Sequence, residues 1–500
     1  MHEKIQKLCE RLPGLAIDAS DAACAPFLRD ASGLEGERPL AVVRPKDAAD
    51  VKPLVEAARA IGIGLVPVSS GGEHHRGDTL CAPETVVVDL RSLSRIVRID
   101  RRNRVFLAEA GVTFADLVPA LAAKGLRPML PLGPRPEKSV LGAYLEREPT
   151  IHPRFQWDMS DPLLCTEVVF GTGELFRTGS AAGPGTLEEQ WLAGDAQKNP
   201  MGPGQSDLVR LLQGAQGTIG IVTWCSAKCE LLPARETLHL AAAPSLAALA
   251  PLVRHLLRRG HADVLFLADA RALAALLADD REDFVRARAA AAPWNLVFSV
   301  SDGAWFPDER RAFVMRELRE ALAAAGLAPA AATPYGTLED LHTRVTRPDL
   351  GRGRAWWKKA GLAATREIFF QTTLDRAERL LAAAEDVLAT SGISRDDVLT
   401  TVQPQLGGRV CHVEIDLAFD EENAARVMTA FSALARALKA AGAFFSRPYG
   451  PLVEVAFDGA STAPLVPRIQ RLFDPDRILS PGRLRVPERL LQDGGLHAVQ

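Results

Sequence analysis

Titratable side chains occupy every second position of segment 410–418. His412, Glu414 and Asp416 alternate there with apolar residues, and because successive side chains of a β-strand point to opposite faces, this spacing places all three on one face. His412 titrates near neutral pH, and Glu414 could orient it or tune its pKa, which is the pairing that a general base needs. Two possibilities stay open, since the polar face either lines a pocket or meets solvent.

A second group of candidate side chains lies in segment 444–450. Arg447 can bind a carboxylate or a phenolate through two parallel hydrogen bonds, and Tyr449 can donate a third. Arg447 could instead form an ion pair between two parts of the chain. Trp356 and Trp357 could close an aromatic pocket, but we expect them to pack a loop. The candidate catalytic residues are therefore His412, Glu414, Arg447 and Tyr449.

A glycine-rich loop covers residues 69–78. Its adjacent Gly71 and Gly72 let the backbone approach a ligand closely and turn several N–H groups toward one point, as in loops that hold phosphate. The glycine spacing of a nicotinamide-binding Rossmann motif is missing, because Phe176 stands where a third glycine should follow Gly171 and Gly173. A Gly-Lys-Ser/Thr loop for ATP is missing as well. A pyrophosphate is the group that the loop at 69–78 suits.

Further glycines and short motifs recur at family-like spacing. Segment 211–223 places three glycines just before a β-branched strand. Together with Val66-Pro67-Val68, Val86 to Leu90, Ala110-Gly111-Val112, Phe473-Asp474-Pro475 and Pro481-Gly482, it resembles the FAD-linked oxidases of the p-cresol methylhydroxylase (PCMH) and vanillyl-alcohol oxidase type. The likeness covers about residues 38 to 233 and the closing segment.

The resemblance implies an FAD-binding domain of two α+β subdomains with the cofactor between them. By this likeness the loop at 69–78 holds the pyrophosphate, and segment 131–142 lines the middle of the flavin. Ser139-Val140-Leu141-Gly142 keeps one glycine where the family usually has two. The implied FAD-binding residues are Ser70, Gly71, Gly72, Glu73, His74, Arg76, Gly77, Pro131, Leu132, Ser139, Gly142, Gly217, Gly220, Ile221 and Val222.

Two departures from relatives bear on covalent attachment and on metal. Some relatives attach FAD through a histidine directly after the Gly-Gly pair, where this chain has Glu73, so we expect non-covalent FAD. Segment 407–412 resembles a Gly-Asp-Gly-Asn-x-His run of glycolate- and D-lactate-oxidising members, which hold a metal with further histidines. Here Gln403 and Gln405 stand upstream instead, and we expect no metal.

The elements that must position these residues follow from the periodicity. It predicts a helix over 47–61, strands over 63–68, 85–90, 96–99 and 105–109, and a helix over 114–124, followed by mostly ordered loops over 129–220. Beyond residue 233 it predicts helices over 245–258, 270–278, 308–325, 375–391 and 421–441 and strands over 262–267, 294–300, 366–372, 397–403 and 410–418. The expected fold is α+β. It comprises a two-subdomain PCMH-type FAD-binding domain (1–236), an α+β substrate cap domain with an antiparallel sheet covered by helices (237–445), and a C-terminal segment that returns to the FAD domain (446–500).

Composition limits the class of protein. Of 500 residues, 47% are hydrophobic and 24% charged, as in folded globular chains of several domains. The net charge of −3 offers no field for nucleic acid. We expect no membrane span and no export signal, and seven scattered cysteines favour reduced thiols, so the predicted location is cytoplasmic.

These observations predict an FAD-dependent oxidoreductase, a dehydrogenase or an oxidase. It would take a hydride from a hydroxyl-bearing or benzylic carbon of a small anionic substrate, either a 2-hydroxy acid such as lactate or glycolate or a phenolic compound. The chain has no heme or cluster motif, so a dehydrogenase needs a redox partner protein such as a cytochrome or an iron–sulfur subunit. The alternative is a flavin-binding electron-transfer or assembly subunit without its own substrate chemistry.

Overall fold

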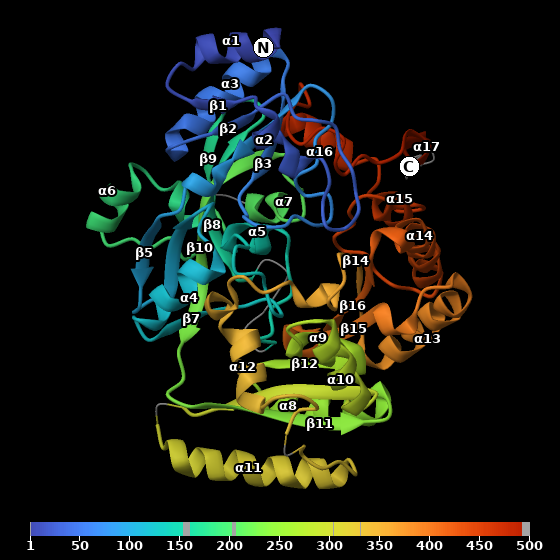
Figure 1. Cartoon of the computed structure of the whole chain (residues 1–500). Coiled ribbons are helices and arrows are strands. Elements are labelled where there is room, and N and C mark those ends of the chain that lie inside the picture. The colour runs from blue at the N-terminus through green and yellow to red at the C-terminus, as the bar shows by residue number, and fades with distance from the viewer. Residues whose placement is uncertain (1, 154–160, 203–206, 304, 331, 493–500) are drawn as a thin grey trace, which may run out of the picture.

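A computed structural model describes residues 2–153, 161–202, 207–303, 305–330 and 332–492, and three β-sheets organise them (Figure 1). Two sheets lie in the N-terminal half and one in the C-terminal half. The fold is α+β, as predicted. Among the described residues, no helix is both long enough and apolar enough to cross a bilayer.

The first sheet has the strand order β1-β2-β4-β3. Its strands are β1 (Ala16–Asp18), β2 (Val42–Arg44), β3 (Gly64–Val68) and β4 (Thr85–Asp89), and β4 pairs in parallel with both β2 and β3. Helix α3 (Val51–Ile61) connects β2 to β3 and buries Leu54 and Val55, as its apolar spacing predicts. It ends at Gly62, whose φ of 72° is left-handed. Helices α1 (Glu3–Arg11) and α2 (Asp21–Cys24) precede β2 in the chain.

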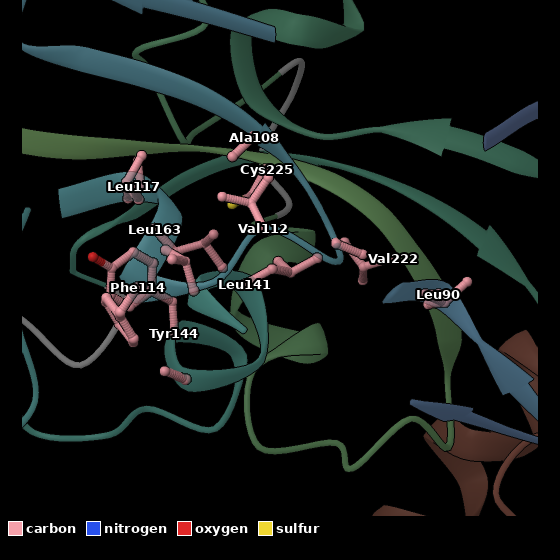
Figure 2. Packing of buried hydrophobic residues seen from close by; sticks show 14 of the residues in the cluster. Leu90, Ala108, Val112, Phe114, Leu117, Leu141, Tyr144, Leu163, Val222 and Cys225 are labelled. Atoms are coloured by element: carbon pink, nitrogen blue, oxygen red, sulfur yellow. The ribbon is translucent and has the colours of Figure 1, made fainter. Parts of the chain in front are cut away.

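The second sheet is antiparallel throughout, with the order β5-β6-β10-β8-β9 and β7 paired to β10. Its strands are β5 (Ile96–Asp100), β6 (Val105–Glu109), β7 (Leu126–Pro128), β8 (Leu163–Phe170), β9 (Leu175–Arg177) and β10 (Gly220–Leu231). Four helices accompany them: α4 (Phe114–Ala122), α5 (Val140–Leu145), α6 (Leu187–Leu192) and α7 (Leu208–Leu212). Phe114 of α4 packs edge-on against Tyr144 of α5, with ring centroids 6.1 Å apart, inside this core (Figure 2).

The prediction of loops over 129–220 is wrong for β8. Every residue of β8 is buried, including Thr166 and Glu167 in its middle, so the strand lacks the alternation that marks a half-exposed strand. Segment 129–220 also contains β9 and helices α5, α6 and α7. These helices have five or six residues each, which is too short for a clear helical period.

The third sheet forms the centre of the cap, with the order β11-β13-β12-β15-β16-β14 and antiparallel pairing throughout. Its strands are β11 (Glu236–Ala243), β12 (Leu265–Asp269), β13 (Trp294–Ser301), β14 (Ala364–Thr372), β15 (Val398–Gln405) and β16 (Val410–Phe419). Helices α8 (Leu246–Arg259), α11 (Pro307–Ala324), α13 (Leu374–Ser391) and α14 (Ala424–Ala440) share one hydrophobic core with it. Helices α9 (Ala270–Leu277), α10 (Arg281–Ala290) and α12 (Leu338–Thr346) contribute to the other large core. The predicted antiparallel sheet covered by helices is confirmed, while β11, α10 and α12 were not predicted.

The end of the described chain returns to the first sheet. After α15 (Leu452–Phe457) and α16 (Val466–Phe473), the amide of Leu65 in β3 donates to the carbonyl of Ile478 at 2.7 Å. The amide of Ser480 donates back to the carbonyl of Leu65 at 2.8 Å. The chain then continues to α17 (Glu488–Gln492).

Candidate functional site

The glycine-rich loop leaves the end of β3 and is held in a fixed shape. Arg76 and Gly77 both have left-handed backbones, with φ of 63° and 70°. The buried carboxylate of Asp30 accepts the amide of Gly77 at 2.6 Å, and burial raises the pKa of Asp30 to about 6. The hydroxyl of Ser70 accepts the amide of Ser139 at 3.0 Å. Both ends of the loop are therefore anchored by hydrogen bonds to other elements.

A first cavity, of about 1180 Å³ including the solvent at its mouth, runs beside this loop. Three polar atoms on its wall are buried and lack a hydrogen-bond partner among the described residues: Nδ1 of His74, Oδ1 of Asp78 and Oγ1 of Thr79. Buried polar atoms are normally satisfied. The cavity is therefore built to receive a partly polar ligand.

A second cavity, of about 590 Å³, lies on the cap side. It shares Arg76, Asp78, Glu146 and Arg447 with the first cavity, so the two adjoin. Trp356 contributes to its wall and contacts His75 in an edge-on arrangement, with 4.4 Å between ring centroids. Its other lining residues include Pro131, Leu132, Arg135, Lys138, Glu148, Trp357, Lys358, Gln403 and Glu414.

A buried charge network surrounds the place where the cavities meet. The guanidinium of Arg76 binds Glu367 through both Nε and Nη2, and its Nη1 donates to Glu146 at 3.1 Å and to Glu148 at 3.0 Å. Burial would raise the pKa of Glu148, but the charges of Lys138 and Arg76 lower it to about 2. Glu367, on β14, is fully buried, and Arg76 compensates its charge.

Lys358 connects this network to β16. Its ammonium donates to Glu367 at 2.6 Å and also to Glu414, and the neighbouring carboxylates raise its pKa although burial opposes this. Oxygens of Glu367, Glu414 and Asp416 come within 4.8 Å of one another. Burial raises the pKa of Asp416 well above its ordinary value, and its two oxygens are buried without a hydrogen-bond partner among the described residues. Asp416 is thus the carboxyl of this cluster whose charged form burial disfavours.

The structure decides where the polar face of segment 410–418 lies. His412, Glu414 and Asp416 are 3%, 4% and 1% exposed, so this face does not meet solvent. Nε2 of His412 lies 3.3 Å from Glu414, and burial lowers the pKa of the imidazole. Glu414 lines the second cavity, whereas the lining of neither cavity includes His412.

Arg447 and Tyr449 occupy different positions relative to the cavities. Arg447 lines both, donates to the carbonyl of Glu146 at 2.7 Å, and lies over the ring of Phe369 with its guanidinium carbon 4.2 Å from the centroid. Tyr449 lines the first cavity, but its hydroxyl donates to the carbonyl of Glu367 at 2.6 Å, and burial raises its pKa. Only Arg447 of the two has its polar group at the junction.

The residues expected to bind FAD fall into three groups. Those on the wall of the first cavity are Ser70, His74, Arg76, Gly142, Gly217, Gly220 and Val222. Pro131 and Leu132 line the second cavity together with Arg76. Gly71, Gly72, Glu73, Gly77, Ser139 and Ile221 line neither. The carboxylate of Glu73 instead accepts a hydrogen bond from Lys359 at 2.9 Å. The amide of Ser139 donates to the hydroxyl of Ser70, which does line the first cavity.

Sequence reasoning missed most of the charge network. Glu148, Lys358 and Glu367 belong to it. Lys358 lies only 9 positions from Glu367, but Arg76 lies 72 positions from Glu148 and 291 from Glu367. A local signal for such a pair does not exist. Trp356 and Trp357 do more than pack a loop, because both line the second cavity while their indole N–H groups donate to the carbonyl of Gly133.

Comparisons with known proteins agree with this geometry. Residues 39–179 match the family model described as FAD binding domain. The chain is 27% identical over 222 residues to the glycolate oxidase subunit GlcD of Bacillus subtilis, an alignment that covers 44% of this chain and 43% of the relative. It is 23% identical over 209 residues to the mitochondrial D-lactate dehydrogenase [cytochrome] of Arabidopsis thaliana, covering 42% of this chain and 33% of that protein. The alignments thus span between a third and about two fifths of these relatives.

Two solved structures resemble the whole chain. The 4-ethylphenol oxidase of Gulosibacter chungangensis superposes with a TM-score of 0.78 at 17% identity, over 97% of each chain. The p-cresol methylhydroxylase superposes with a TM-score of 0.75 at 17% identity, over 97% of this chain and 96% of that one. The chain therefore contains an FAD binding domain at residues 39–179, so its cofactor is FAD, and it shares its overall fold with these two solved structures.

Proposed function

We propose that this protein is an FAD-dependent oxidoreductase that takes a hydride from a hydroxyl-bearing or benzylic carbon of a small anionic substrate. The substrate class would be a 2-hydroxy acid such as lactate or glycolate, or a phenolic compound. The observation that carries the proposal is the buried guanidinium of Arg447 where the two cavities meet, which has no carboxylate ion pair within 4 Å among the described residues.

The first cavity fits FAD. Peptide dipoles of the loop at 69–78 and the unpartnered atoms of His74 and Thr79 suit a phosphate. Gly217 also lines this cavity with a φ of 75°, and a Cβ there would lie 2.7 Å from Oγ of Ser480 and 3.0 Å from Pro67. When bound, FAD supplies the hydride acceptor and passes electrons to an outside acceptor.

Arg447 would orient the substrate. Burial lowers the pKa of its guanidinium to about 10, so it remains a cation at neutral pH. Among the described residues, no carboxylate oxygen lies within 4 Å of this guanidinium, and the one hydrogen bond that it donates goes to a backbone carbonyl. The remaining N–H donors are available to a carboxylate or a phenolate in two parallel hydrogen bonds.

His412 is the better candidate for the base that takes the substrate's proton. Burial lowers its pKa, so the imidazole is neutral at pH 7 and can accept a proton, and Glu414 stabilises the resulting cation. Tyr449 is less suited, because burial raises its pKa and its hydroxyl already donates to a carbonyl. His412 would act through Glu414, which reaches the second cavity.

The electron acceptor and the location belong to the same proposal. One relative's name includes a cytochrome, which supports a cytochrome or an iron–sulfur protein as the redox partner. The seven cysteines are all free, which supports the reducing cytoplasm.

The test is anaerobic absorbance of the purified protein with D-lactate, glycolate, 4-cresol and vanillyl alcohol in turn. Bleaching of the flavin bands by one of them would support the proposal and give the substrate class. A yellow protein that none of them bleaches would favour the electron-transfer or assembly subunit. Arg447→Met should raise KM at least tenfold while FAD is retained, and the matched control is Arg436→Met, at an exposed position of α14.

A further inference from the structure

The C-terminal segment is attached to the strand that leads into the glycine-rich loop. Its backbone forms hydrogen bonds with Leu65 of β3 on both sides. The carboxylate of Asp474 accepts the amides of Ile478 at 3.1 Å and Leu479 at 2.7 Å, which fixes the turn before this contact. Because β3 runs directly into the loop at 69–78, the residues after Ser480 are held beside that loop.

Arg483 is the charged residue that this attachment delivers to the first cavity. Its Nη2 donates to the carbonyl of Leu80 at 3.2 Å. Among the described residues, no carboxylate oxygen lies within 4 Å of its guanidinium. Burial lowers the pKa of Arg483, yet a guanidinium stays charged at neutral pH. A partly buried cation thus lines the cavity with spare donors.

The other two guanidinium groups of this cavity do different work. Arg76 has its donors taken by Glu367, Glu146 and Glu148. Arg447 lies at the cap end, since it lines both cavities, whereas Arg483 lines only the first and contacts the residue that follows Thr79. Arg483 is therefore the cation at the loop end, and no carboxylate of the described residues forms an ion pair with it within 4 Å.

We propose that Arg483 binds the diphosphate of FAD and thereby makes retention of the cofactor depend on the C-terminal segment. The diphosphate is the anionic part of FAD, and the planar guanidinium matches phosphate oxygens in two parallel hydrogen bonds. Its charge adds to the peptide dipoles and the hydroxyl of Thr79, which line the same cavity. This inference goes beyond the proposed function, because retention of FAD does not depend on which substrate is oxidised.

The test follows release of FAD from the holoprotein after dilution, read as the gain of flavin fluorescence. Arg483→Met should release FAD about tenfold faster or more, because a charged hydrogen bond is lost, and Arg483→Lys should fall between it and the unchanged protein. Arg485→Met is the matched control, since the side chain of Arg485 is 76% exposed. The visible spectrum and the reduction potential of the flavin should stay unchanged in Arg483→Met.

Three results would overturn the proposal. The first is an unchanged release rate in Arg483→Met. The second is equal acceleration in Arg483→Met and Arg485→Met, which would mean a general loosening of the C-terminal segment. The third is a shifted reduction potential in Arg483→Met, which would place the guanidinium at the flavin ring. Thermal unfolding of the FAD-free variants checks that each one is folded.

Discussion

Replacing Lys358 by methionine tests whether the buried charge network stabilises the fold. The ammonium of Lys358 contacts Glu367 and Glu414, whose side chains are 0% and 6% exposed. Removing it leaves two buried carboxylates without one of their partners, and breaking a buried ion pair from one side costs about 3–5 kcal/mol. We expect Lys358→Met to lose that much free energy of unfolding.

The neighbouring lysine supplies the control. Lys359 binds Glu73, whose side chain is 52% exposed, and ion pairs with an exposed partner contribute about 0–1 kcal/mol. Lys359→Met should therefore lose less than about 1 kcal/mol. Urea unfolding followed by circular dichroism, with FAD saturating throughout, measures both. In the double variant Lys358→Met/Glu414→Gln, part of the loss should return because one of the two carboxylates becomes neutral. If Lys358→Met costs no more than Lys359→Met, the network contributes nothing to stability and the reasoning is refuted.

Three further variants test individual groups. Asp416→Asn should be more stable than the unchanged protein at neutral pH, by about 1–3 kcal/mol, because burial raises the pKa of Asp416 and so disfavours the carboxylate in the folded protein. This gain should vanish as the pH falls below about 4, and urea midpoints at pH 4 and 7.5 measure it. Glu148→Gln should lose about 3 kcal/mol of unfolding free energy at pH 7, because Lys138 and Arg76 lower the pKa of Glu148 to about 2 against the effect of burial. The difference in unfolding free energy from the unchanged protein should shrink as the pH falls from about 4.5 toward 2, and a constant difference would contradict this. Gly217→Ala should bind FAD at least about tenfold less tightly, because the φ of Gly217 is 75° and the new Cβ would meet Ser480 and Pro67. Equilibrium dialysis measures the binding of FAD. The control is Gly459→Ala, at a left-handed glycine with open space around it.

Part of this fold could be predicted from the sequence because some elements show a regular local spacing of apolar residues. Helix α3 and strand β16 show clear helical and alternating patterns, and both form where expected. Strand β8 was not predicted because it is buried on both faces, so its sequence lacks the alternation of polar and apolar residues that identifies strands. Strand β11 was not predicted either, although the helix that follows it was predicted over 245–258 and forms as α8.

The candidate site could be predicted only in its outline. His412 and Glu414 were found as a pair because they lie two residues apart on one strand. The sequence did not show that Lys358 neutralises Glu414, since that contact is made by the tertiary fold. Local spacing likewise identified the loop at 69–78. Of its seven positions expected to bind FAD, only Ser70, His74 and Arg76 line the first cavity, because the path of the loop depends on left-handed residues such as Arg76.

The contact between Arg76 and Glu367 has a consequence for recombination between relatives. One partner belongs to the glycine-rich loop and the other to the cap sheet, so the two halves share a set of charges that is balanced only when both are present. A chimera that takes residues 237–445 from another flavoprotein would inherit one half of this balance without the other. Exchange of residues 237–445 would therefore require Arg76, Glu146 and Glu148 to be transferred with them, although all three lie outside this range in the sequence.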